Sequence, residues 1–203
     1  FDPAQAAPLT DAGLTPYHAI RRSAAKMTPD ATVLVLGVGG LGHLGVQIAR
    51  ATSSAQVIAV DLKPSALDLA RQVGADACIA ADDEHVLDKI KELTNGNGAD
   101  VVVDFVGAQP TVELALAAAR PLADVTIVGI AGGQVPWSFF SQAYEVSLQT
   151  TYWGSRPELV ELLTLAARGR IHSEYTTYPL DQAVQAYRDL QDGKVTGRAV
   201  VVP

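Results

Sequence analysis

Residues 33–42 read Val-Leu-Val-Leu-Gly-Val-Gly-Gly-Leu-Gly, an apolar run that leads into the pattern Gly-x-Gly-x-x-Gly. A continuous apolar run of this kind is typical of a strand that is buried on both faces. Residues 41–51 then carry apolar side chains at helical spacing, so the glycines lie between a strand and a helix. The glycine pattern is weak evidence alone, but in this setting it predicts a loop that holds the pyrophosphate of a dinucleotide.

Each glycine of this loop has its own expected role. Gly37 allows the tight turn, Gly39 lets the backbone approach a phosphate, and Gly42 lets the helix pack closely against the strand. The helix that begins near Gly40 and Leu41 presents unpaired N–H groups and a positive dipole end to an anion. The alternative is a glycine-rich turn that binds no ligand.

An acidic residue stands where a ribose-binding carboxylate is expected. Asp61 ends a second apolar run, residues 57–60, and follows Gly42 at about the 20-residue spacing of dinucleotide-binding units. A carboxylate there accepts hydrogen bonds from the ribose hydroxyls of NAD and repels the 2′-phosphate of NADP, which favours NAD. Lys63 has two interpretations, a cation that helps to hold the ribose or tolerates a phosphate, and an exposed, solvated lysine.

Strand-like and helix-like segments alternate through the middle of the chain, which predicts an α/β fold. Further strands are expected at residues 77–80, 101–106, 125–130 and 146–152, and further helices at 65–73, 84–93, 110–119 and 157–168. Together they predict a doubly wound, parallel, six-stranded Rossmann sheet made of two mononucleotide-binding halves.

The two ends of the chain differ from the middle. Residues 4–26 suggest a helix with a break at Pro8 and a turn at residues 12–13. Near the other end, residues 173–179 suggest a strand, 180–191 a helix, and 198–202 a short strand without an obvious neighbour in the main sheet. These terminal segments are therefore expected to belong with a second domain. Because the first residue is Phe1 and not Met, we expect the sequence to be a piece of a longer chain.

Composition narrows the class of partner. The 203 residues are 48% hydrophobic and carry a formal charge of −7, which is typical of a globular protein and unfavourable for binding nucleic acid or anionic membranes. A small-molecule substrate is the expected partner. A single cysteine, Cys78, excludes a disulfide framework and fits a cytoplasmic location, and no apolar run approaches the roughly 18 residues of a membrane span.

Residues that could carry other chemistry are few and scattered. The four histidines, His18, His43, His85 and His172, form no metal-binding motif. His43, just past the glycine loop, has two equal interpretations: a ring that faces phosphate or a reacting group, and a packed helix residue. Asp11 alone is most simply a helix cap or a solvated charge. The apolar cluster at residues 137–140, Trp-Ser-Phe-Phe, suggests either core or a contact between subunits.

The sequence resembles the zinc-dependent medium-chain alcohol dehydrogenases, most closely their NAD-dependent bacterial secondary-alcohol branch. The resemblance covers essentially the whole chain, and it rests on the segments 7–17, 37–45, 60–61, 73–76, 104–107 and 197–201. It implies that residues 1–26 are a linking segment from a catalytic domain, that 27–172 form the NAD-binding domain, and that 173–203 return to the catalytic domain. Most of that catalytic domain would then be missing.

The resemblance also implies roles for individual residues. Asp11 falls at the third ligand of the catalytic zinc, whereas the first two ligands and the proton relay have no counterpart, so no complete catalytic set is present. The implied coenzyme contacts are Leu41 at the pyrophosphate, Asp61 at the ribose, Phe105 and Val106 near the adenosine half, Val128, Gly129 and Ile130 near the nicotinamide, Trp153 at its carboxamide, and Arg198 on the phosphates. Ala66 stands where relatives often carry a basic residue, which affects coenzyme affinity.

For the intact enzyme the resemblance implies a zinc-bound alcohol that loses a hydride to NAD, the alcohol or ketone being secondary. The chain alone is expected to bind NAD without turnover, and to associate with a second copy through residues 137–140. Two alternatives remain open: a zinc-free quinone or enoyl reductase of the same superfamily, which usually prefers NADPH, and a non-catalytic nucleotide-binding or interaction module.

Overall fold

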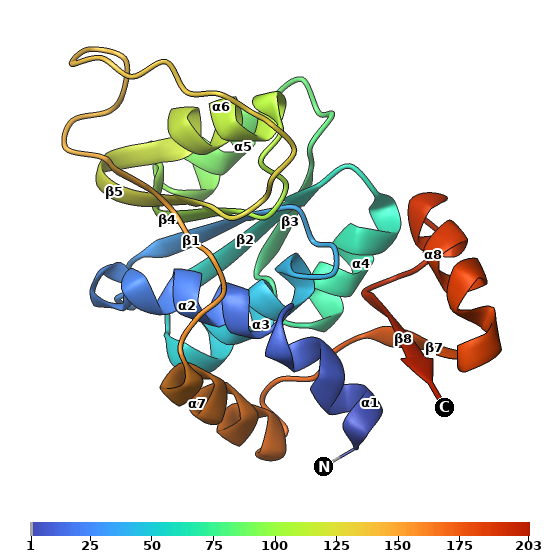
Figure 1. Ribbon diagram of the computed structural model, residues 1–203. Coiled ribbons are helices and arrows are strands. Elements are labelled where there is room, and N and C mark those ends of the chain that lie inside the picture. The colour runs from blue at the N-terminus through green and yellow to red at the C-terminus, as the bar shows by residue number, and fades with distance from the viewer. Residues whose placement is uncertain (1) are drawn as a thin grey trace.

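The centre of the molecule is a parallel sheet with the strand order β3-β2-β1-β4-β5-β6 (Figure 1). The computed structural model describes residues 2–203. The strands are β1 (Thr32–Leu36), β2 (Gln56–Asp61), β3 (Ala77–Ala80), β4 (Ala99–Asp104), β5 (Ala119–Ile127) and β6 (Ser147–Thr150). All five neighbouring pairs are parallel, and the chain reverses its direction of winding between β1 and β4. The predicted doubly wound, six-stranded sheet is confirmed.

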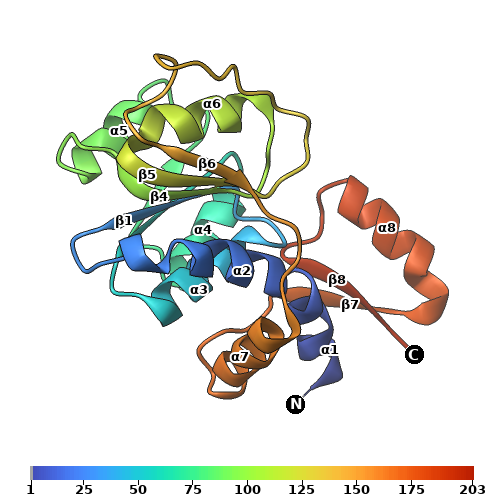
Figure 2. The same ribbon diagram turned by 60° about the vertical axis from the view of Figure 1, so that its left-hand side comes forward.

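Helices cover both faces of the sheet (Figures 1 and 2). On one face lie α2 (Leu14–Arg22), α3 (Gly42–Thr52), α4 (Pro64–Gln72) and α7 (Arg156–Ala167), and on the other α5 (Val86–Leu93) and α6 (Gln109–Ala118). This arrangement explains the continuous apolar runs in β1 and β2, because a strand between two helical layers has no face in contact with water.

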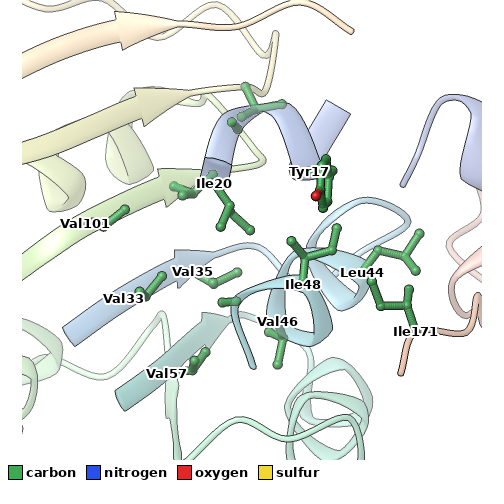
Figure 3. Close-up of a cluster of buried hydrophobic side chains, with 14 of the residues drawn as sticks. Tyr17, Ile20, Val33, Val35, Leu44, Val46, Ile48, Val57, Val101 and Ile171 are labelled. Carbon is green, nitrogen blue, oxygen red and sulfur yellow. The ribbon is translucent and has the colours of Figure 1, made fainter. Parts of the chain in front are cut away.

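The core on the α3 face is built from alternate strand residues. Val33 and Val35 of β1 and Val57 of β2 point toward α3, where they meet Val46 and Ile48 (Figure 3). The intervening residues of β1 point the opposite way, into the core beneath α5 and α6. α3 is thus fixed on the sheet by fully buried side chains, and its first turn is held at the carboxyl end of β1.

The terminal segments form a separate small unit beside the glycine loop (Figure 2). α1 (Pro3–Ala6) ends before Pro8, as the sequence predicts, and a single 3-10 turn follows at Ala7–Thr10. β7 (Tyr175–Pro179) and β8 (Arg198–Val202) pair in parallel, connected by α8 (Ala183–Gln191). β8 therefore has its partner outside the main sheet, as predicted.

The structure corrects the ends of three predicted strands. β4 stops at Asp104, because the Asp104 carboxylate accepts hydrogen bonds from the backbone of Val106 and Gly107 and turns the chain away from the sheet. β5 covers residues 119–127, so residues 128–130 lie in a loop, and β6 covers only 147–150. Two of the segments expected to touch coenzyme are consequently loops at the carboxyl edge of the sheet. None of the helices within residues 2–203 has the length and apolar character needed to cross a membrane.

A partly buried carboxylate joins α2 to α7. Glu158 lies in the first turn of α7, where its Oε2 accepts hydrogen bonds from the backbone and hydroxyl of Ser155, and its Oε1 lies 2.8 Å from Nδ1 of His18. Burial would raise the pKa of Glu158, but the hydrogen bonds from Ser155 and His18 outweigh it and hold that pKa at about 2. The ionised form is therefore the one that the fold stabilises.

We expect Glu158→Gln to lower stability in a pH-dependent way. A carboxyl group whose pKa falls on folding contributes its stability in full above its unfolded value of 4.5, and loses it as the pH falls toward 2. The difference in free energy of unfolding between wild type and variant, measured by urea titration, should therefore be greatest at neutral pH and shrink below pH 4.5. Glu92→Gln, at an exposed position, is the control, and a difference that stays constant down to pH 2.5 would contradict the assignment.

Candidate functional site

The glycine loop connects β1 to α3, and its two ends, at Gly37 and Gly42, lie in close contact. Gly37 has a φ of +83°, and a Cβ on Gly42 would lie 1.8 Å from the carbonyl oxygen of Gly37. Gly39 differs, because no heavy atom lies within 4 Å of the place where its Cβ would be. The turn and packing roles predicted for Gly37 and Gly42 are confirmed. The role of Gly39 toward a pyrophosphate stays a prediction, and the loop leaves open space there.

Gly40, the third glycine of the loop, is approached closely by a residue that is distant in the chain. A Cβ on Gly40 would lie 2.8 Å from Cδ of Arg198 and 3.1 Å from the carbonyl oxygen of Gly197. The stem of Arg198 therefore crosses directly over the loop, and its Nη2 lies 3.5 Å from Oδ2 of Asp11. This arrangement brings together a predicted phosphate contact, Arg198, and a predicted metal ligand, Asp11.

Asp61 is fixed at the end of β2 by hydrogen bonds to the loop beside it. Its Oδ2 accepts from the backbone N–H of Val38 at 2.7 Å, and its Oδ1 accepts from the backbone N–H of Lys63 at 2.8 Å. A cavity of about 170 Å³ opens next to it. This cavity is lined by Val38, Gly39, Asp61, Lys63, Ser65, Ala66, Gly193, Val195, Thr196 and Gly197. The carboxylate, the glycine loop and the segment before β8 thus share one pocket.

Asp104 organises the second half of the site, and the sequence interpretation gave it no role. It is fully buried, its Oδ1 accepts from the backbone N–H groups of Val106 and Gly107, and its Oδ2 accepts from the hydroxyl of Thr111. Its carbonyl oxygen accepts from the backbone of residues 128 and 129. The sequence contains one indication of this role, an acidic residue at the end of an otherwise apolar strand. A carboxylate buried at that position needs several hydrogen-bond donors around it.

The other predicted coenzyme contacts line the same edge of the sheet but are exposed to different degrees. The Phe105 ring packs on α3, since a Cβ on Gly45 would lie 2.6 Å from its Cε2. Val128 is buried, whereas Ile130 is 97% exposed and Trp153 55% exposed. A Cβ on Gly129 would lie 2.0 Å from the carbonyl carbon of Val106, so the two loops touch through their backbones.

His43 faces the interior and not the loop surface. Its ring is fully buried, Nδ1 lies 2.9 Å from the carbonyl oxygen of Gly39, and Nε2 lies 3.1 Å from the backbone nitrogen of Glu174. Burial lowers the pKa of His43, which keeps the ring neutral. Of its two interpretations, the packed helix residue agrees with this position.

The described part of the chain, residues 2–203, brings no three potential metal ligands together. Asp11 is about half exposed and faces Arg198. His18 contacts Glu158, and His85 and His172 are exposed. A tetrahedral zinc site needs at least three protein ligands, so the side chains around Asp11 do not fit a zinc ion by themselves.

A larger cavity, of about 580 Å³, lies at the opposite, amino edge of the sheet. Two of its charged groups, Asp100 and Arg120, are paired with each other, and Asp100 also accepts from the backbone N–H of Thr32. Open parallel sheets bind ligands at the carboxyl ends of their strands, beside the point where the winding reverses. We therefore assign the candidate site to the carboxyl edge, where backbone N–H groups, Asp61 and Arg198 can bind phosphates and a ribose.

Comparisons with known proteins find similar dehydrogenases. Residues 40–168 match the family model described as zinc-binding dehydrogenase. An NAD-dependent alcohol dehydrogenase of Sulfurisphaera tokodaii is 33% identical over 98% of this chain and 58% of its own length. A D-arabinose 1-dehydrogenase (NADP⁺) of Saccharolobus solfataricus is 32% identical over the whole chain and 59% of its own length. The crystal structure of an Aeropyrum pernix alcohol dehydrogenase superposes with a TM-score of 0.90 and 38% identity, over 98% of this chain and 58% of that one.

The glycine loop predicts unequal effects of alanine on stability at two of its positions, Gly42 and Gly39. Gly42→Ala forces a methyl group against the Gly37 carbonyl and should lower the free energy of unfolding by about 1–3 kcal/mol. Gly39→Ala, which meets no atom within 4 Å, should change it by less than about 0.5 kcal/mol. Urea unfolding followed by circular dichroism measures both, and equal losses at the two positions would contradict this description of the loop.

Proposed function

The chain belongs to the family of zinc-dependent medium-chain alcohol dehydrogenases, and on this basis we propose that it is the coenzyme-binding part of an NAD-dependent alcohol dehydrogenase. The chain spans a little over half the length of the curated relatives it matches. The proposed whole enzyme transfers a hydride between NAD(H) and an alcohol or ketone, the secondary type being favoured by the sequence resemblance. The observation that carries the proposal is the open space at Gly39 beside the fixed carboxylate of Asp61.

The residues present fit a dinucleotide. A space that a Cβ would fill lies at Gly39, directly before the N-terminus of α3, where a helix dipole and unpaired N–H groups favour phosphate. In the proposed site the glycine loop and Arg198 hold the phosphates, Asp61 and Lys63 hold the adenosine ribose, and the loops at 105–106 and 128–130 with Trp153 enclose the remainder. NAD, when bound, supplies the hydride acceptor. This chain contributes binding and orientation.

The proposed division of the chain follows the same logic. Residues 27–172 would be the NAD-binding domain, residues 1–26 a linking segment, and residues 173–203 a return to a catalytic domain. The separate β7–β8 sheet supports the second boundary, since it shares no strand pairing with the main sheet. Asp11 remains the proposed zinc ligand of the intact enzyme, and the other ligands of that zinc would be supplied by residues outside this sequence.

Steady NAD reduction by the purified chain with zinc and a secondary alcohol would contradict the proposal that the chain binds NAD without turnover.

The proposed alcohol dehydrogenase and the alternative, a zinc-free reductase, differ in the coenzyme that they prefer. A quinone or enoyl reductase of the same superfamily would prefer NADPH, and one of the relatives is named for NADP⁺. Asp61 favours NAD here, because its carboxylate lies in the ribose pocket and a 2′-phosphate would bring two like charges together.

A single free cysteine, Cys78, is compatible with the cytoplasmic location that we propose.

A second copy of the chain is the proposed protein partner. Trp137 is 56% exposed, and Phe139 and Phe140 are 87% and 92% exposed, in the segment between β5 and the edge strand β6. Large apolar side chains in one exposed stretch are unfavourable in water and are typical of contact surfaces. We propose that this segment pairs with its twin across a two-fold axis.

We expect the chain to bind NADH in preference to NADPH. Asp61→Asn should reduce this preference by about tenfold, because it removes the like-charge repulsion while keeping a side chain of the same shape. Fluorescence titration with both coenzymes measures the ratio. Tighter binding of NADPH by the wild type would favour the reductase alternative.

Gly39→Ala tests the proposed position of the pyrophosphate in the same titration. It should weaken NADH binding at least about tenfold while leaving the unfolding transition unchanged, because its methyl group occupies only the space left for phosphate. Unchanged NADH affinity in this variant would contradict the proposed position of the pyrophosphate.

We expect the chain to be a dimer or larger assembly in solution. The double substitution Phe139→Ser and Phe140→Ser should shift it toward the monomer, as measured by light scattering after gel filtration. Tyr187→Ser removes another exposed aromatic ring, from α8, and should leave the mass unchanged. A wild type that is monomeric at all concentrations would contradict the proposed contact.

A further inference from the structure

Three consecutive residues, 172–174, are held by side chains that bind their backbone. The Gln47 amide accepts from the N–H of His172 at 2.9 Å and donates to its carbonyl oxygen at 2.9 Å. The Gln5 amide does the same for Ser173, at 2.6 and 3.1 Å. Each amide replaces a neighbouring strand, so this extended segment is fixed to α1 and α3 without belonging to either sheet.

The third residue of this segment is bound by His43. A backbone N–H can only donate, so the Nε2 of His43 accepts from Glu174, and the proton of the neutral ring is on Nδ1. Nδ1 then donates to the carbonyl oxygen of Gly39 at 2.9 Å. One rigid, buried ring thus connects the middle glycine of the loop to the backbone of residue 174.

Glu174 in turn contacts β8. Its carbonyl oxygen accepts from the backbone N–H of Arg198 at 2.9 Å, and a Cβ on Gly197 would lie 2.1 Å from the same oxygen. Arg198 returns over the glycine loop, where its stem fills the space above Gly40. The contacts therefore form a closed series: His43 joins the glycine loop to Glu174, Glu174 binds Arg198, and Arg198 lies over the glycine loop. Within this series, His43 provides the side-chain contact from α3.

We propose that His43 is a positioning residue for the coenzyme. His43 acts through Glu174 to hold Arg198 at a fixed distance from the glycine loop. The inference rests on the proposed coenzyme function. His43 touches neither phosphate nor ribose, and its effect comes from presenting the loop N–H groups and the Arg198 guanidinium to a pyrophosphate as one unit. Pre-organised groups of this kind bind more tightly, because the protein loses less conformational freedom on binding.

Two variants of His43 separate this role from simple core packing. Asn places an amide nitrogen close to the position of Nδ1, so His43→Asn keeps the donor to Gly39 and loses the acceptor for Glu174. Gln reaches the position of Nε2, so His43→Gln keeps the acceptor for Glu174. We expect His43→Asn to weaken NADH binding about tenfold or more and His43→Gln to stay within about threefold of wild type, since an unpaired buried N–H is costly. His85→Asn, at an exposed histidine, is the control and should have no effect.

A double-substitution cycle tests whether His43 acts through Arg198. If it does, His43→Asn should cause little further loss of NADH affinity when it is added to Arg198→Ala. Equal losses in the His43→Asn and His43→Gln variants, or an additive cycle, would mean that His43 contributes only packing and would overturn the proposal.

Hydrogen exchange measured without coenzyme adds a readout that does not depend on coenzyme binding. Without coenzyme, the Glu174 amide should exchange faster in His43→Asn than in wild type or His43→Gln. In the wild type, NADH should slow exchange at Glu174, because coupling between two sites is reciprocal. NADH that binds without changing this exchange would overturn the proposal. A wild type that fails to bind NADH would instead refute the proposed function, and the coenzyme-free exchange would still report whether His43 holds Glu174.

Discussion

The contact between the first residue of α3 and the Gly37 carbonyl is the constraint on which the site depends. With 1.8 Å between that oxygen and the place of a Cβ on Gly42, the helix can start where it does only if it starts with glycine. This close approach directs the N-terminus of α3 toward the open space at Gly39. It also sets the depth of the helix on the sheet, which the buried side chains of Val46 and Ile48 then maintain (Figure 3). The packing of α3 and the open space at Gly39 are therefore set by the same few backbone atoms.

Two aspartates at the ends of neighbouring halves of the sheet perform comparable tasks. Asp61 binds the backbone of Val38 in the glycine loop, and Asp104 binds the backbone of the loop that follows β4. In both cases a carboxylate at the last position of a strand fixes the adjacent loop, because backbone N–H groups beyond the sheet edge have no strand partner. The difference lies in exposure: Asp104 is fully buried with all its neighbours from protein, whereas Asp61 also borders the cavity. That difference separates a carboxylate that organises the fold from one that remains available to a ligand.

Local patterns in the sequence were sufficient for the sheet, the glycine loop and the terminal β-unit. The apolar runs of β1 and β2, the helical spacing after Gly42 and the break at Pro8 each report on their own neighbourhood, and each agrees with the structure. The ends of β4 and β5 were mispredicted, because Val106 and residues 128–130 are apolar but lie beyond the point where Asp104 turns the chain. The pairing of His43 with Glu174, and of Gly40 with Arg198, had no local signal at all. Such contacts join residues far apart in the chain, and their existence follows only from how the terminal unit is placed against α3.

The segment clamped by Gln5, His43 and Gln47 also bears on how the protein is made. The partners in this clamp are far apart in the chain, 131 residues for His43 and Glu174 and 168 for Gln5 and Ser173. Contacts of such long range form late, because the chain entropy lost in closing them is recovered only after both partners are in place. During synthesis the main sheet through β5 can assemble while β7 and β8 are still absent, since domains fold as their residues emerge. A nascent chain would therefore pass through a stage in which the glycine loop is folded and the stem of Arg198 does not yet lie over Gly40.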